Sequence, residues 1–263
     1  MKLQFPFAGL PIGKAMQAIN QTIEAGTPIP TQKNPAGSPT PSDTGPCNAA
    51  SVGATCANLH ELFRQSPVHR FPFDAAALPR NGIYILFEKG ETGHGGNRIV
   101  RVGTHTGNNQ LPSRIKQHFL NENKDRSIFR KNIGRCLLNR ADDPFLKFWN
   151  LDLTSRAARE EHQHKVDFVS QKEIERQVTK FLQTQFWFVA FEVPEKEVRL
   201  DLESKIISTV SLCEECRPSP GWLGLSSPTK RIRDSGLWLV NELWKTPLSG
   251  GDFGTLSELI GRS

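Results

Sequence analysis

Two short apolar segments separated by glycines constrain the fold of this chain more than any other feature of the sequence. Residues 83–87 are β-branched, aromatic and apolar, and they follow an Asn81-Gly82 turn, so we expect a strand there. The segment 98–103 has the same character, and four glycines lie between the two segments. Two strands joined by a short glycine-rich connection predict an antiparallel hairpin.

The residues after the hairpin show mainly helical patterns. Pro112 stands in the first turn of an expected helix over 111–120, a favourable place for proline, and Ile115 and Phe119 lie four residues apart on it. Further expected elements are a helix over 127–138, an exposed charged insertion or helix over 154–176, an apolar strand over 186–193 and an amphipathic helix over 198–212. This order predicts an α/β (α+β) fold, in which helices flank a small mixed or antiparallel three-stranded sheet.

The N-terminal residues differ in composition from this pattern. Residues 1–26 could form a short amphipathic helix, whereas 17 of the 30 residues in 27–56 are Pro, Gly, Ser or Thr and none is aromatic. Such a stretch buries too little apolar surface to offset its chain entropy, so we expect a flexible linker or disorder. The predicted domain limits are an N-terminal extension over 1–58, a folded domain over 59–246 and a C-terminal tail over 247–263.

Several classes of protein are not expected from the composition. No apolar run reaches about 18 residues, so the sequence predicts no transmembrane helix. The first residues make a poor signal peptide, because two prolines and Lys14 interrupt them. Five cysteines are few and odd in number, which favours a reducing cytoplasm over a disulfide framework. Cys213 and Cys216 form a CxxC motif, but no second CxxC or spaced histidine pair accompanies it, so we do not expect a zinc site.

The basic charge of the chain, whose net charge is +6, is concentrated in one region. The window 110–140 contains eight basic residues and two acidic ones, and a surplus of this kind attracts a phosphate backbone. A solvated helix face would have the same composition, but the window directly follows the hairpin, which favours the nucleic-acid interpretation. The residues expected to bind DNA are Lys116, Lys124, Arg126, Arg130, Lys131 and Arg135.

An ordered set of short motifs runs through the same region and beyond it. The tripeptide GIY opens the first expected strand, and RVG closes the second. In chain order the motif residues are Gly82, Ile83, Tyr84, Arg101, Val102, Gly103, Arg114, His118, Glu203 and Asn241. Over about residues 77–243, with insertions, this set resembles the GIY-YIG nuclease superfamily. The SRIKQHF helix and the long insert before the third strand resemble its restriction-endonuclease branch.

The resemblance implies a metal-dependent endonuclease that hydrolyses phosphodiester bonds in double-stranded DNA, with Mg²⁺ or Mn²⁺ as cofactor. It makes Glu203 the metal ligand, Arg114 a phosphate-binding guanidinium, and Tyr84 the residue that orients or deprotonates the attacking water. His118 would donate to the phosphate or assist proton transfer, and Asn241 would steady the active site or the substrate. We expect a restriction or defence role in the cytoplasm. Such an enzyme could form a homodimer and could act together with a partner DNA methyltransferase.

The surroundings of Glu203 allow a simpler interpretation as well. Glu203 shares its helix face with Leu200, Ile206 and Ile207. A carboxylate on an apolar face is costly to bury unless it has a cation or a hydrogen-bond partner. A metal ion meets this need, and so does an ordinary pair with a lysine or arginine.

Arg101 departs from the family pattern, because the resemblance calls for a tyrosine there and Tyr84 is the sole tyrosine of the chain. An arginine could contact the phosphate or lower the pKa of a neighbouring hydroxyl, so Arg101 is counted among the catalytic candidates. It could also indicate altered or lost activity. The alternatives are therefore a repair or mobile-element nuclease of relaxed specificity and a catalytically inactive DNA-binding module on the same fold.

Overall fold

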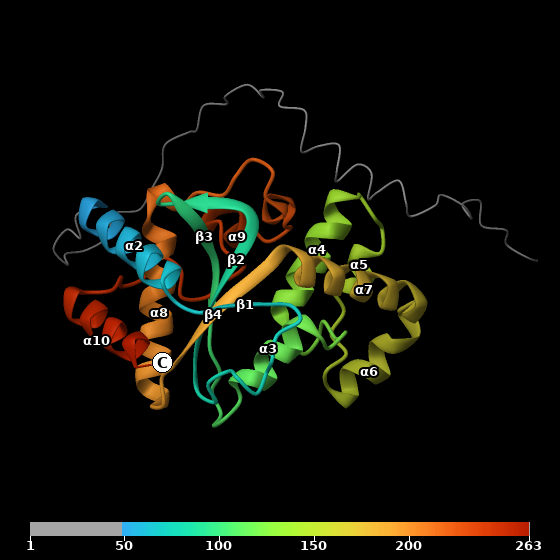
Figure 1. The fold of residues 1–263 in the computed structure, drawn as a ribbon. Coiled ribbons are helices and arrows are strands. Elements are labelled where there is room, and N and C mark those ends of the chain that lie inside the picture. Colours follow the sequence, from blue (N-terminus) through green and yellow to red (C-terminus); the bar gives the residue numbers. More distant parts are fainter. Residues whose placement is uncertain (1–48, 263) are drawn as a thin grey trace, which may run out of the picture. The chain divides into compact units, whose positions relative to one another are not determined.

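The computed structural model describes residues 49–262, which fold around one antiparallel sheet (Figure 1). The helix expected within 1–26 and most of the linker expected over 27–56 lie outside the described residues. The strands are ordered β1-β4-β2-β3 across the sheet, with β1 at Val68–Arg70, β2 at Gly82–Gly93, β3 at Gly96–Gly103 and β4 at Phe186–Glu192. The α/β fold class is confirmed. The sheet has one strand more than expected, because β1 is three residues long and too short to show an alternating pattern.

The hairpin of β2 and β3 turns at His94 and Gly95, whose φ angles are 48° and 71°. Gly93 pairs with Gly96 across this turn, so the loop has two residues. Left-handed backbone at both loop positions matches the twist of the flanking strands. Strand β2 therefore extends well beyond the strand expected over 83–87, because the chain turns only near the end of the glycine-rich stretch.

Helices cover both faces of the sheet, as the alternation of side chains along β2 requires. Ile83 and Ile85 belong to the core on one face, and Tyr84 and Leu86 belong to the core on the other. The helices of the first face are α2 (Ala49–Arg64), α8 (Lys196–Leu212) and α10 (Gly250–Gly261). The helices of the second face include α3 (Leu111–Phe119), α4 (Ile128–Arg140) and α7 (Phe168–Gln185). Figure 1 shows the two groups on opposite sides of the strands.

The helices expected over 111–120, 127–138 and 198–212 are confirmed as α3, α4 and α8, with ends that differ by two residues at most. The remaining short helices of the described chain are α5 (Leu146–Trp149), α6 (Arg156–His162), η1 (Gln163–Lys165), η2 (Glu214–Cys216), η3 (Leu223–Ser226) and α9 (Lys230–Ser235). The charged stretch over 154–176 contains α6, η1 and the first half of α7. Within residues 49–262 no helix is both long and apolar enough to cross a membrane.

Both ends of the described chain differ from the expected domain limits. Helix α2 begins at Ala49 and fully buries Leu59, although we expected a linker up to residue 56. The alanines of its first half favour a helix, whereas the Ser, Gly and Thr among them suggested a linker. At the other end α10 fully buries Leu256. Residues 49–58 and 250–261 are thus part of the packed fold rather than an extension and a tail.

Candidate active site

A pocket of about 470 Å³ brings together four of the residues expected at the active site. Arg101 comes from β3, Arg114 from the first turns of α3, and Glu203 from the middle of α8. Asn241 reaches the pocket from the segment between α9 and α10. These residues are far apart in the sequence, and the packing of α3 and α8 on opposite faces of the sheet places them around one opening.

Glu203 has an unusual electrostatic position in this pocket. Burial is the main reason that the pKa of its carboxyl group is raised to about 7, and the charge of Glu242 acts in the same direction. The positive charges of Arg101 and Arg114 and a hydrogen bond from the Thr104 backbone oppose this rise only in part. None of the ion pairs among residues 49–262 includes Glu203. The carboxylate therefore lacks a direct counterion, and a bound cation would relieve the cost of its burial.

Tyr84 and His118 meet behind the pocket. The Tyr84 side chain is fully buried, and its hydroxyl lies 2.8 Å from His118 Nε2. His118 Nδ1 lies 2.8 Å from the hydroxyl of Ser127, the N-cap residue of α4. Burial, together with the charges of Arg101 and Arg114, lowers the pKa of His118 well below its usual range. The ring is thus neutral, and its Nε2 can accept the Tyr84 hydrogen bond while Nδ1–H donates to Ser127.

Arg101 connects the pocket with Tyr84. Its Nε lies 3.4 Å from the Tyr84 hydroxyl, and its Nη1 donates to the carbonyl oxygen of Trp238. The guanidinium also lies 4.9 Å from the centre of the Phe129 ring. Arg101 lines the pocket, whereas Tyr84 does not. Arg101, which stands where the family pattern has its second tyrosine, therefore lines the pocket and also contacts the Tyr84 hydroxyl.

The glycines of both motifs are required by close contacts. A Cβ atom on Gly82 would lie 2.1 Å from the carbonyl oxygen of Phe191, and a Cβ atom on Gly103 would lie 2.2 Å from the Tyr84 hydroxyl. Atoms cannot approach so closely, so any larger residue at either position would displace its neighbour. Gly103 in particular makes the space in which the Tyr84 hydroxyl lies.

The six cations expected to bind DNA are placed very differently. Lys116 and Arg126 are exposed. Arg135 is half-buried and donates to the side-chain oxygens of Asn132 and Asn150. Lys131 is buried and pairs with Asp125 at 3.3 Å, so it offers little surface to DNA.

The expectation that Arg130 and Lys124 bind DNA is wrong, because neither has the exposed surface that a phosphate contact needs. Arg130 is fully buried, forms a 2.7 Å ion pair with Glu175, and donates to the backbone oxygen of His118. Lys124 is 1% exposed and pairs with Asp125 at 2.9 Å. Arg130 thus stabilises the fold around His118, and Lys124 is held by Asp125 and the Leu151 carbonyl oxygen, so neither offers a surface to DNA.

Several residues of the site were not predicted from the sequence. Ser127 could have been found, because it stands at the N-cap position before an expected helix. The others show no local signal, since their role depends on residues distant in the chain. They are Thr104 beside Glu203, Trp238 beside Arg101, and the pocket residues Asn132, Ser204 and Glu242.

Comparison with known protein families agrees with this geometry. The model of the GIY-YIG domain matches residues 63–258, which include β1 to β4 and every expected site residue. No curated protein and no solved structure matches the chain. The GIY-YIG domain is a nuclease domain, which implies DNA as the substrate. Because the match covers most of the sequence, the chain belongs to the GIY-YIG domain family.

Proposed function

We propose that this protein is a DNA endonuclease that depends on Mg²⁺ or Mn²⁺ and whose catalytic centre is the pocket of Arg101, Arg114 and Glu203. The observation that supports this most strongly is the Glu203 carboxylate, which is partly buried and has no direct counterion in the described chain. Magnesium characteristically binds one or two protein carboxylates and keeps several waters. Two carboxylates line the pocket of about 470 Å³, and Glu242 is paired with Lys245, so Glu203 is the one that fits this requirement.

The two arginines are proposed to bind the scissile phosphate. Arg114 donates through Nη1 to the side chain of Gln117 and to the carbonyl oxygen of Arg126, and its remaining N–H groups are available toward the pocket. A guanidinium presents a fixed fork of donors that matches phosphate oxygens. Bound at Glu203, Mg²⁺ or Mn²⁺ would supply further positive charge to the phosphoryl and leaving oxygens.

Tyr84 is proposed to take the proton of the attacking water while its own proton passes to His118 Nε2. The 2.8 Å contact between these two groups supports this route, and it favours proton transfer over phosphate donation by His118, whose ring is fully buried. The low pKa of His118 opposes the transfer in the free protein. A DNA phosphate near Arg101 and Arg114 adds negative charge and thereby raises the proton affinity of the ring. Because Tyr84 is buried, Arg101 must shift for water to reach it.

Asn241 is proposed to steady the phosphate or the bound water at the rim of the pocket. It lines the pocket and is exposed, so its amide can both donate and accept there. Lys116 and Arg126 are proposed to contact DNA outside the pocket, since both are exposed near Arg114.

A restriction or defence role, with the protein in the cytoplasm, remains our proposal for the biological context. It is supported by the SRIKQHF sequence of α3 and by the long insert before β4, which contains α5 to α7. A homodimer and a partner methyltransferase are further proposals that follow from this role. The alternative of an inactive DNA-binding module is favoured by one observation, the burial of Tyr84 behind Arg101.

Cleavage of supercoiled plasmid by the wild-type chain distinguishes these functions. We expect nicked or linear product with Mg²⁺ or Mn²⁺ and none without a divalent ion, and a gel-shift assay in the absence of metal should show DNA binding. Discrete fragments from a long DNA would support the restriction role, whereas a smear would favour a nuclease of relaxed specificity. Binding without any cleavage under all metal conditions would identify the inactive module instead.

A further inference from the structure

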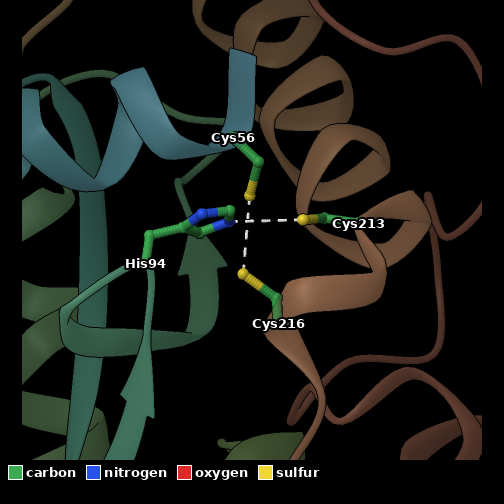
Figure 2. Close-up of side chains that lie close together, drawn as sticks. All are labelled: Cys56, His94, Cys213 and Cys216. Atoms are coloured by element: carbon green, nitrogen blue, oxygen red, sulfur yellow. Dashed lines mark hydrogen bonds between the residues drawn. The ribbon is translucent and has the colours of Figure 1, made fainter. Parts of the chain in front are cut away.

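We propose that Cys56, His94, Cys213 and Cys216 bind one structural Zn²⁺ ion. The site lies apart from the pocket of Arg101, Arg114 and Glu203, and the proposal does not depend on nuclease activity. Figure 2 shows the four side chains converging from three parts of the chain.

The separations between the ligand atoms fit a single tetrahedral ion. The sulfurs of Cys56 and Cys216 are 3.5 Å apart, and the Cys213 sulfur lies 3.3 Å from His94 Nε2. All four ligand atoms lie within 4.8 Å of one another. Zinc bonds of about 2.3 Å to sulfur and about 2.0 Å to nitrogen require tetrahedral ligands about 3.5–3.8 Å apart. A small contraction of the cluster around the ion therefore completes the site.

The local fold aims each ligand at the same point. Cys56 lies on α2, Cys213 directly follows α8, and Cys216 ends η2. His94 occupies the first position of the β2–β3 turn, where its φ of 48° is uncommon for a residue other than glycine. This turn holds the imidazole toward the three sulfurs, as Figure 2 shows.

The hydrogen bonds of the histidines identify His94 as the ligand. His94 Nδ1 lies 3.4 Å from a carboxylate oxygen of Glu215, which leaves Nε2 free to face the sulfurs. A carboxylate on the outer nitrogen is the usual support of a zinc-bound histidine. His60, which lies nearby, is already used at both nitrogens. Its Nδ1–H donates to the Cys56 carbonyl oxygen, and its Nε2 accepts from the Ile99 amide.

The site is closed to solvent, which indicates a structural rather than a catalytic ion. The three cysteines are at most 4% exposed, and the His94 side chain is 4% exposed. Four protein ligands leave no open position for a substrate, and thiolates with an imidazole select zinc over magnesium or calcium. The ion would connect α2 and the hairpin with the end of α8, the helix that carries Glu203. Since Cys56 precedes residues 63–258, the site would also attach α2 to the matched domain.

This proposal differs from the expectation from the sequence, which did not favour a zinc site because no second CxxC or spaced histidine pair accompanies Cys213 and Cys216. The two other ligands come from single positions, 119 residues before Cys213 and 160 residues before Cys216. Only the fold brings them together.

Metal analysis of the purified full-length chain tests the proposal directly. We expect about one zinc per chain by mass spectrometry of the metal content, and reduced thiols at all four cysteines of the described chain. Replacing zinc by Co²⁺ should produce the intense visible bands of tetrahedral cobalt and near-ultraviolet thiolate-to-cobalt bands. Removing the ion should lower the thermal unfolding temperature, and adding zinc back should restore it.

Matched variants locate the ion. Cys56→Ala and His94→Ala should each lower the zinc content at least about fivefold, because each removes one of four ligands. Cys136→Ala, a buried cysteine outside the cluster, and His164→Ala, an exposed histidine, should keep the wild-type content. Glu215→Gln should retain zinc but release it to a competing chelator about 10–100 times more readily.

The wild-type measurements also overturn the proposal if it is wrong, even where a variant does not fold. A folded, reduced chain without zinc that shows no cobalt spectrum would refute it. A Cys56–Cys216 disulfide or equimolar iron would refute it as well. Unchanged zinc content in both ligand variants would place the ion elsewhere.

Discussion

Replacing Glu203 by glutamine should stabilise the protein while removing its activity. The structure gives the reason, since burial raises the pKa of this carboxyl from 4.5 to about 7. At pH 8 the folded chain must hold an ionised group that is more costly in the fold than in the unfolded chain. At about 1.36 kcal/mol per pKa unit, this difference amounts to about 3–4 kcal/mol at most. Solvent screening of a partly exposed side chain reduces it, so we expect Glu203→Gln to gain about 1–2 kcal/mol.

The dependence on pH gives the sign of the effect. A group with a raised pKa in the folded state stabilises the fold at low pH, and this contribution is lost as the pH rises through about 7. The wild-type chain should thus lose stability relative to Glu203→Gln between pH 5 and pH 8. Near pH 5 the folded carboxyl is protonated, and the gain from glutamine should fall below about 1 kcal/mol.

Thermal unfolding in magnesium-free buffer measures this difference. At pH 8 the unfolding temperature of Glu203→Gln should exceed that of the wild type by about 2–8 °C, and Mg²⁺ should raise only the wild-type value. Chelators are omitted so that the proposed zinc site stays loaded. Glu242→Gln is the matched control, because Glu242 lines the same pocket but its pKa is lowered by Lys245 and Ser204. An equal or lower unfolding temperature for Glu203→Gln at pH 8 would show that ionised Glu203 does not destabilise the fold.

Tyr84→Phe keeps the ring and deletes the hydroxyl, so the rate of single-turnover cleavage should fall at least about a hundredfold while DNA affinity stays unchanged. An unchanged rate would show that Tyr84 is a core residue only. His118 is buried with a lowered pKa, so below about pH 6.5 the unfolded chain takes up a proton that the folded chain does not. As the pH is lowered through this range, the unfolding free energy should therefore decrease more steeply in wild type than in His118→Gln. Parallel profiles from urea denaturation would contradict this. Replacing Lys116 and Arg126 by alanine should weaken DNA binding for all sequences and lower the salt slope by about one to two; an unchanged slope in fluorescence anisotropy would show that these exposed cations do not contact phosphates.

Much of the secondary structure could be predicted from short stretches of neighbouring residues. The apolar strand at 83–87 and Pro112 at the first turn of α3 are contained in a few neighbouring residues, and both elements were predicted correctly. Strand β1 was missed because three residues show no period and its pairing is made with distant β4. Helix α2 was missed because its small residues resemble a linker in composition.

The candidate site was predictable only in part, for the same reason. The family motifs identified Arg101, Arg114 and Glu203, which the structure brings to one pocket. Composition could not show that Arg130 is buried, because its partner Glu175 is 45 residues away. Nor could it show that Arg101 would lie against the Tyr84 hydroxyl, since this contact depends on the register of β2 and β3.

Single-turnover cleavage of plasmid DNA by wild type and Glu203→Ala, measured with saturating protein and Mg²⁺, shows directly whether Glu203 acts in catalysis. We predict that Glu203→Ala binds DNA with wild-type affinity but cleaves it at least about a hundredfold more slowly, because the pocket loses the carboxylate that we propose binds the metal. Glu242→Ala, from the same pocket wall, should retain most of the rate. Full cleavage by Glu203→Ala would show that this carboxylate, and any metal ion bound to it, has no part in hydrolysis.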